Sequence, residues 1–287
     1  MMQFLGTAAA DAMPGPFCEC WICQEARREP AKNRLRSLFL LDEENIIDCG
    51  PDLAAACMKW QVNLSALKNI FLTHTHEDHL CVSNAGLLIM SRTRGGVPVD
   101  LYLSGEAYDT LMESHRLLGS PYDHLDARKS ITRGVVRLVP ITFFEPFTVD
   151  GYEVFAVPTT HRIGEKERAI NYLFTIPDGR TLLYACDTGL YPRESLEALE
   201  GRGIDILIME ATFGSRLDND TSSHLNGMAF LQQLDTFLRM GIITGCTRVY
   251  ATHINHKHEF NHEQYQAFFD ERAPVKVVVA SDGLMVE

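Results

Sequence analysis

The residues at 74–79 read His-Thr-His-Glu-Asp-His and place three imidazoles and a carboxylate within one short segment. These groups are the nitrogen and oxygen ligands that zinc and related divalent ions take in proteins. In an extended segment alternate side chains face the same way, so His74 and His76 can bind one ion together. Asp78 and His79 follow where the chain turns, and they can face a second ion. The alternative is a chance His-rich loop, but the density of ligands favours a metal site.

Three further candidate ligands follow separate predicted strands. They are His161 after Tyr152–Val157, Asp187 after Thr181–Cys186, and His253 after Arg248–Thr252. A lone His or Asp at a strand end is most often a turn or capping residue. Three such residues at three strand ends are what a site at one edge of a sheet requires. A carboxylate can bridge two ions, and Asp187 is the candidate for that position.

A second cluster of possible ligands, Cys18, Cys20 and Cys23, lies in a Pro/Gly/Cys-rich segment near the N-terminus. Three thiols at this spacing favour a tetrahedral zinc, which needs a fourth ligand from elsewhere in the chain. Buried thiols or a redox pair are the alternatives in a reducing compartment.

Short apolar runs between turn residues predict the strands that must position these groups, and 3.6-residue periodicity predicts the helices between them. Lys68–Leu72 is the predicted strand that delivers the segment 74–79. The chain has neither a Gly/Ser/Pro linker nor a fixed repeat, which predicts one α/β domain over residues 1–287 with two helix-flanked mixed sheets. The other predicted elements are strands at 3–5, 37–41, 45–48, 99–103, 135–139, 147–149, 171–176, 204–209 and 275–280, and helices at 51–60, 105–118, 194–200 and 225–240.

The overall charge bears on partners and location. With 26 Lys and Arg against 38 Asp and Glu, the net charge is −12, which disfavours nucleic acid as the main partner because phosphate binding relies on cationic side chains. No basic and apolar N-terminal leader is visible, and no apolar run approaches the roughly 18–20 residues of a membrane span. We therefore expect a cytoplasmic protein without a membrane partner.

The ligands occur in the order His-x-His-x-Asp-His, His, Asp-Thr-Gly and a final His, which resembles the metallo-β-lactamase superfamily over essentially the whole chain. The resemblance implies an α/β (α+β) fold, the four-layer αββα sandwich, with two metal ions at one edge of the sheets. It implies that His74, His76 and His161 hold the first ion. Asp78, His79 and His253 would hold the second ion, and Asp187 would bridge both.

Within this superfamily the cysteine loop, at about residues 14–24, is similar to that of the PhnP-type phosphodiesterases of the carbon–phosphorus lyase pathway. In that family the fourth zinc ligand comes three residues after the last active-site His, which here is His256. His258 and His262 are nearby rivals that do not match the motif. PqqB-type proteins also carry Cys-x-Cys-x-x-Cys, but they generally lack the complete His-x-His-x-Asp-His set.

The segments Glu210-Ala211-Thr212-Phe213 and Ser223-His224 are similar to elements of tRNA 3′-processing nucleases of the same superfamily. The resemblance implies that His224 faces the substrate phosphate and donates a proton, while Glu210 orients its imidazole. The plainer alternative is that Glu210 ends a strand and His224 caps a helix. The long Gly/Pro-rich arm of those nucleases is missing. The region 97–146 is the candidate for substrate-specific loops, and it contains His115, Arg116, Tyr122, His124 and Arg128.

Together these features predict a phosphodiesterase that cleaves a small, possibly cyclic, phosphodiester. Two divalent ions, zinc or manganese with iron as a third option, would hold a hydroxide between them, with Asp78 helping to orient it. One structural zinc, at the cysteine cluster, would be the third ion of the chain. The alternatives are a lactonase, thioesterase or β-lactamase, a tRNA-processing-like nuclease, or a non-catalytic PqqB-like accessory protein. The oligomeric state stays open, with a homodimer as one option.

Overall fold

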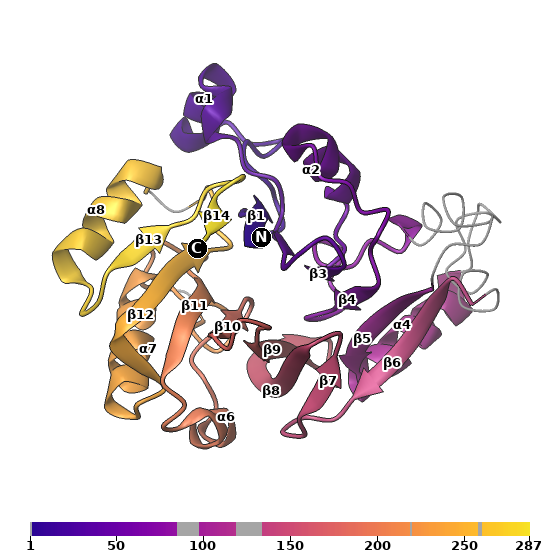
Figure 1. Cartoon of the computed structure of the whole chain (residues 1–287). Helices are drawn as coiled ribbons and strands as arrows, with labels where there is room; N and C mark the ends of the chain where they lie inside the picture. Colours follow the sequence, from indigo (N-terminus) through magenta and orange to yellow (C-terminus); the bar gives the residue numbers. More distant parts are fainter. Residues whose placement is uncertain (1, 85–97, 119–133, 219, 258–259) are drawn as a thin grey trace.

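Two mixed β-sheets lie face to face in the computed structural model, which describes residues 2–84, 98–118, 134–218, 220–257 and 260–287 (Figure 1). Each sheet has seven strands within the described residues. The first sheet has the order β14-β1-β2-β3-β4-β5-β6 and the second β13-β12-β11-β10-β9-β8-β7. The strands are β1 Met2–Gly6, β2 Leu38–Leu40, β3 Asn45–Ile47, β4 Asn69–Phe71, β5 Val99–Ser104, β6 Val136–Ile141, β7 Phe147–Val149, β8 Tyr152–Ile163, β9 Glu167–Thr175, β10 Thr181–Ala185, β11 Ile204–Glu210, β12 Ile243–Thr252, β13 Val277–Val279 and β14 Met285–Val286.

The two sheets share one pairing pattern. In the first sheet, β14-β1, β1-β2 and β2-β3 are antiparallel, and β3-β4, β4-β5 and β5-β6 are parallel. The second sheet repeats three antiparallel pairings from β7 to β10 and three parallel ones from β10 to β13. Residues 2–141 therefore build most of one sheet and residues 147–279 build the other. The carboxyl ends of β4, β10 and β12, which all have parallel neighbours, lead into the predicted active-site ligands other than His161.

Helices cover the outer face of each sheet, which gives four layers (Figure 1). Between the sheets lies an aromatic core that includes Phe39, Phe71, Tyr172 and Phe174. A second apolar cluster packs α2 and α4 on the first sheet, and a third packs α6, α7 and α8 on the second. This arrangement confirms the predicted αββα sandwich. The helices are α1 Trp21–Arg28, α2 Leu53–Trp60, α4 Gly105–Leu118, α6 Arg193–Leu199, α7 Gly227–Arg239 and α8 His262–Arg272, with a 3-10 turn at Pro30–Lys32.

Several elements differ from those predicted, and the change in β8 affects the site. The strand predicted at 152–157 continues as β8 to Ile163, so His161 lies within a strand. The register with β9 shifts between Pro158 and Arg162, and this irregularity re-aims the end of the strand. The helix α8 was not predicted, because few of its residues are apolar, with only Tyr265 and Phe269 fully buried.

Some sequence candidates fall outside the described residues, namely Tyr122, His124, Arg128 and His258. Nothing in the structure bears on their roles. Within the described part of the chain, none of the helices has the length and apolar character needed to span a bilayer.

Candidate dinuclear metal site

The imidazoles predicted to hold the first ion converge at one end of the sandwich. His74 Nε2 lies 3.0 Å from His76 Nδ1, and His161 Nε2 lies 3.2 Å from the same atom. Nitrogen ligands around a tetrahedral zinc lie roughly 3.3 Å apart, given Zn–N bonds of about 2.0–2.1 Å. Burial lowers the pKa of both His74 and His161, which favours the neutral imidazole that a metal needs. The three side chains therefore fit a shared ion in spacing and in protonation.

The residues predicted for the second ion lie beside this cluster. His79 Nε2 is 2.6 Å from Asp187 Oδ2 and 3.3 Å from Asp78 Oδ2, and His253 Nε2 is 3.7 Å from the same Asp78 oxygen. Asp187 Oδ2 is also 3.5 Å from His74 Nε2, so one carboxylate faces both sets of imidazoles. Burial tends to raise the pKa of Asp187, but His253 and His79 outweigh it and hold that pKa well below its usual value. Asp187 thus contacts histidines of both predicted ligand sets.

Buried atoms without hydrogen-bond partners test whether metal fits here. His79 Nε2, Asp187 Oδ1 and His253 Nε2 are buried and have no partner with hydrogen-bond geometry among the described residues, although His79 Nε2 lies 2.6 Å from Asp187 Oδ2. Buried polar atoms are normally satisfied, and each exception needs an explanation. Metal ligation supplies that explanation, because all three atoms belong to predicted ligands and face the same space.

Four of the histidine rings make a hydrogen-bond contact through Nδ1, the nitrogen that is not predicted to bind metal. His161 Nδ1 donates to Ser223 O (3.0 Å), and His79 Nδ1 donates to Asp48 Oδ2 (2.7 Å). His74 Nδ1 contacts Thr73 Oγ1 (3.0 Å), and His253 Nδ1 contacts Thr212 Oγ1 (2.9 Å). Anchoring one ring nitrogen fixes the tautomer and presents the other nitrogen to a metal. The structure therefore directs the Nε2 atoms of these four rings toward one another.

Two buried carboxylates complete this support in parallel ways. The hydroxyl of Thr73 donates its proton to Asp48 Oδ1 (2.8 Å). A lone pair of the same hydroxyl oxygen can then accept from Nδ1 of His74. In the same way, the hydroxyl of Thr212 donates its proton to Glu210 Oε2, and a lone pair of that hydroxyl oxygen can accept from the ring of His253. Sequence reasoning missed Asp48. Its signal is the one used for the other candidates, a carboxylate directly after a buried strand, here β3.

Three site residues have left-handed backbones, with φ of +67° at Asp48, +49° at Asp187 and +57° at His253. Non-glycine residues rarely adopt this region, and such strain persists only where surrounding contacts hold it. Each of these residues directly follows, or lies close after, the end of a strand. The turn away from the strand is what aims their side chains along the edge of the sheets.

The predicted acid His224 lies next to Asp187 and Glu210. Its Nδ1 is 3.2 Å from Glu210 Oε1 and 3.3 Å from Asp187 Oδ1. Burial tends to lower the pKa of His224, but the two carboxylates outweigh it and raise the pKa to about 9. The His224 side chain is 18% exposed, whereas Glu210 is fully buried. Glu210 Oε1 also accepts from the Thr188 and Gly189 amides, so Glu210 positions the Asp187 loop as well as His224.

An open cavity of about 350 Å³ gives access to this edge of the sheets. His224 and five predicted ligands (His76, Asp78, His161, Asp187 and His253) line it, together with Ala9, Ala10, Glu77, Thr212, Phe213 and Asn255. Ala9, Ala10 and Phe213 give part of this cavity an apolar wall.

The second predicted metal group also forms. Cys18, Cys20, Cys23 and His256 offer ligand atoms that all lie within 4.8 Å of one another. Cys20 Sγ is 3.6 Å from His256 Nδ1, which matches the roughly 3.6 Å edge of a tetrahedron with Zn–S near 2.3 Å and Zn–N near 2.05 Å. Backbone amides donate to sulfur, and one such amide lowers the pKa of Cys18. A Cβ at Gly15 would come within 2.8 Å of His256 Nε2, so the loop needs glycine to close over this ring.

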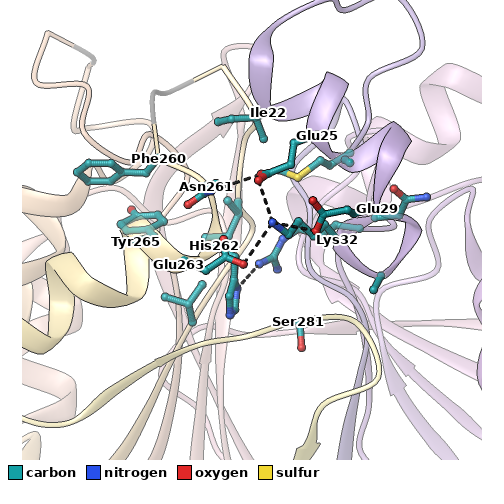
Figure 2. Close-up of a pocket in the computed structure, with 17 residues that line it drawn as sticks. Ile22, Glu25, Glu29, Lys32, Phe260, Asn261, His262, Glu263, Tyr265 and Ser281 are labelled. Atoms are coloured by element: carbon teal, nitrogen blue, oxygen red, sulfur yellow. Dashed lines mark hydrogen bonds and ion pairs between the residues drawn. The ribbon is translucent and has the colours of Figure 1, made fainter.

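The rival ligand His262 is engaged elsewhere. A second cavity, of about 330 Å³, lies between α1 and α8, and none of the predicted ligands lines it (Figure 2). At its wall Arg34 Nη2 lies 2.9 Å from His262 Nδ1. Lys32 pairs there with three carboxylates, Glu25, Glu29 and Glu263. The structure thus brings His256, and not His262, to the cysteines.

Comparison with known proteins decides the family. The model of the beta-lactamase superfamily domain matches residues 45–254, which is most of the chain. The chain belongs to the beta-lactamase superfamily. The metallo-β-lactamase fold generally binds divalent metals such as zinc, so family and fold support a metal-dependent hydrolase.

Individual relatives of this superfamily member are distant. A ribonuclease Z of Shouchella clausii (strain KSM-K16) is 25% identical over 90% of this chain and 93% of its own length. A diphosphatase of the PhnP family has a TM-score of 0.73 at 22% identity, covering 100% of this chain and 96% of that one. Zinc-bound PqqB from Methylobacterium extorquens has a TM-score of 0.68 at 20% identity, covering 100% of this chain and 99% of that one. The two structural matches show the shared fold.

Proposed function

We propose that this superfamily member is a dinuclear phosphodiesterase acting on a small phosphodiester. The observation that carries the proposal is the group of Asp187, Glu210 and His224, in which an accessible imidazole lies 3.3 Å from the predicted bridging carboxylate. Cleavage of a diester with a poor leaving group needs a proton donor near the metals. A PhnP-family diphosphatase and a ribonuclease Z among the matched proteins support chemistry at phosphorus.

Different side chains of the protein would bind the metals, donate the proton and position the proton donor. When bound, two divalent ions lower the pKa of water and neutralise charge on the phosphate. His74, His76 and His161 would hold one ion, Asp78, His79 and His253 the other, with Asp187 between them. His224 holds a proton at the open side of the cavity and delivers it to the leaving oxygen. Glu210, itself buried, keeps that ring in place and acts as a positioning residue.

A nuclease is the second candidate, because the ribonuclease Z relative matches along nearly its whole length. The net charge of −12 speaks against it, since nucleic-acid affinity depends on Lys and Arg at phosphates. We therefore favour a small-molecule substrate, with zinc or manganese in the active site and a zinc at the cysteine cluster.

The test compares turnover of bis(p-nitrophenyl) phosphate with turnover of lactones, thioesters and a precursor tRNA. We expect hydrolysis of the diester, its loss on chelation and its recovery with Zn²⁺ or Mn²⁺. Preferential turnover of lactones or thioesters would refute the assignment, and efficient tRNA cleavage would favour the nuclease. Failure to hydrolyse any of these compounds with full metal content would favour an accessory protein of the PqqB kind.

A further inference from the structure

One fully buried carboxylate near the site takes no part in the proposed chemistry. Glu167 is the first residue of β9 and has no exposed surface. Both of its oxygens accept from a single residue. Thr75 N–H donates to Oε1 (2.8 Å), and Thr75 Oγ1 donates to Oε2 (2.6 Å).

Thr75 connects Glu167 to the predicted metal ligands. Thr75 lies between His74 and His76, two of the three histidines predicted for the first ion. Glu167 lies on the β8–β9 hairpin, paired with Ile163, two residues after His161. The carboxylate therefore joins the two chain segments that supply all three histidines.

A second contact joins the same two segments. The backbone amide of Ile170 donates to Thr73 O (2.9 Å), one residue before His74. That contact holds the chain at Thr73, before the two ligating histidines. The two bonds from Thr75 to Glu167 fix the residue between the ligating rings, and bonds to a carboxylate are stronger than bonds between neutral groups.

We propose that Glu167 is a positioning residue that sets the spacing of His74 and His76 against His161, and so tunes affinity for one of the two active-site ions. The proposal rests on the proposed dinuclear site. It concerns one ion only, because the ring of His79 is held by Asp48 and not by Glu167. Removing a group that is hydrogen-bonded to a metal ligand typically changes metal affinity by about 10- to 100-fold, and we expect an effect up to that range for Glu167, which acts through the residue between two ligands.

The test measures affinity for Zn²⁺ by competition with a chelator, and the visible spectrum of the Co²⁺-substituted protein. In Glu167→Ala we expect one active-site ion to bind about 10- to 100-fold more weakly, with the other ion unchanged and an altered Co²⁺ spectrum. Glu167→Gln keeps an oxygen for the Thr75 amide and should recover most of the affinity. Thr75→Val keeps the branched shape, removes one of the two bonds and should weaken the same ion if Glu167→Ala does not fold.

Two matched variants sharpen the result. Asp48→Asn should weaken both active-site ions, because Asp48 accepts from the ring of His79 and from Thr73, whose hydroxyl contacts the ring of His74. Asp205→Ala removes a similar pair of bonds, from the amide and hydroxyl of Thr181 to one oxygen of an exposed carboxylate at the far end of β10, and should change neither affinity.

The outcomes separate the two hypotheses. Wild-type affinity for both ions in Glu167→Ala and Thr75→Val would overturn the role of Glu167 and leave the proposed function standing. Equal weakening of both ions would also overturn it, since the contact would then act on the whole site. A wild-type protein that binds no ion at these histidines would refute the proposed function, and the role of Glu167 with it.

Discussion

Replacement of His256 by alanine should remove the ion at the cysteine cluster and leave the active-site ions in place. The cluster would retain three thiols, but a structural zinc site is almost always four-coordinate. We expect the metal content to fall from three ions per chain to two. His256 is buried and its Nδ1 is 3.6 Å from Cys20 Sγ, so its removal leaves the fourth ligand position of the cluster open.

The loss of stability can be worked out from linkage. An ion present at about 1,000 times its dissociation constant stabilises the native state by roughly 4.1 kcal/mol. With about 2.1 cal/mol/K of unfolding entropy per residue, a chain of 287 residues has roughly 0.6 kcal/mol/K. The midpoint of thermal unfolding should therefore fall by about 7 °C at that zinc concentration.

The assay combines elemental analysis with thermal unfolding over a range of Zn²⁺ concentrations. His262→Ala is the matched control, because that ring contacts Arg34 and lies away from the cysteines. His262→Ala should keep three ions. Because both variants retain the active-site ions, the stabilisation from those ions cancels when the two unfolding midpoints are compared. The reasoning is refuted if His256→Ala keeps all three ions, or if His262→Ala is the variant that loses one.

Three further substitutions test the active site. Asp187→Ala should leave only the ion at the cysteine cluster and abolish turnover, and elemental analysis showing three ions per chain would contradict the bridging role. His224→Ala should slow turnover of a diester with an alkoxide leaving group by about 10²- to 10⁴-fold at full metal content. The loss should be smaller with p-nitrophenolate, and an equal loss for both would argue against a proton donor. Asp48→Asn should weaken the ion held by His79 by about 10- to 100-fold in chelator competition, with a further effect through Thr73 on the ion held by His74, and unchanged affinity would show that His79 needs no anchor.

The fold, and the convergence of the candidate ligands, were predictable because local pattern and chemistry agree there. The segment 74–79 follows a strand of buried residues, and β4 at Asn69–Phe71 lies within the predicted 68–72. His161 illustrates what a sequence hides, since the register shift in β8 depends on pairing with β9 and leaves no periodic trace. The helix α8 carries a usable signal in its capping box, Asn261 with Gln264, which apolar periodicity alone does not register.

The supporting contacts were not predictable for a different reason. Asp48 with His79, and Glu167 with Thr75, join residues that are 31 and 92 positions apart in the chain. A single carboxylate at a strand end has many plausible partners, and only the packing of the sheets selects one.

The division of the sandwich into residues 2–141 and 147–279 has a consequence for how the site is assembled. His74, His76, Asp78 and His79 come from the first stretch, while His161, Asp187 and His253 come from the second. Neither stretch alone carries a complete set of ligands for either ion. A chain cut in the turn at 142–146 would thus acquire its metals only when the two fragments associate, with β14 of the second fragment adding a strand to the sheet of the first. Metal uptake in such a split protein would be a direct readout of fragment complementation.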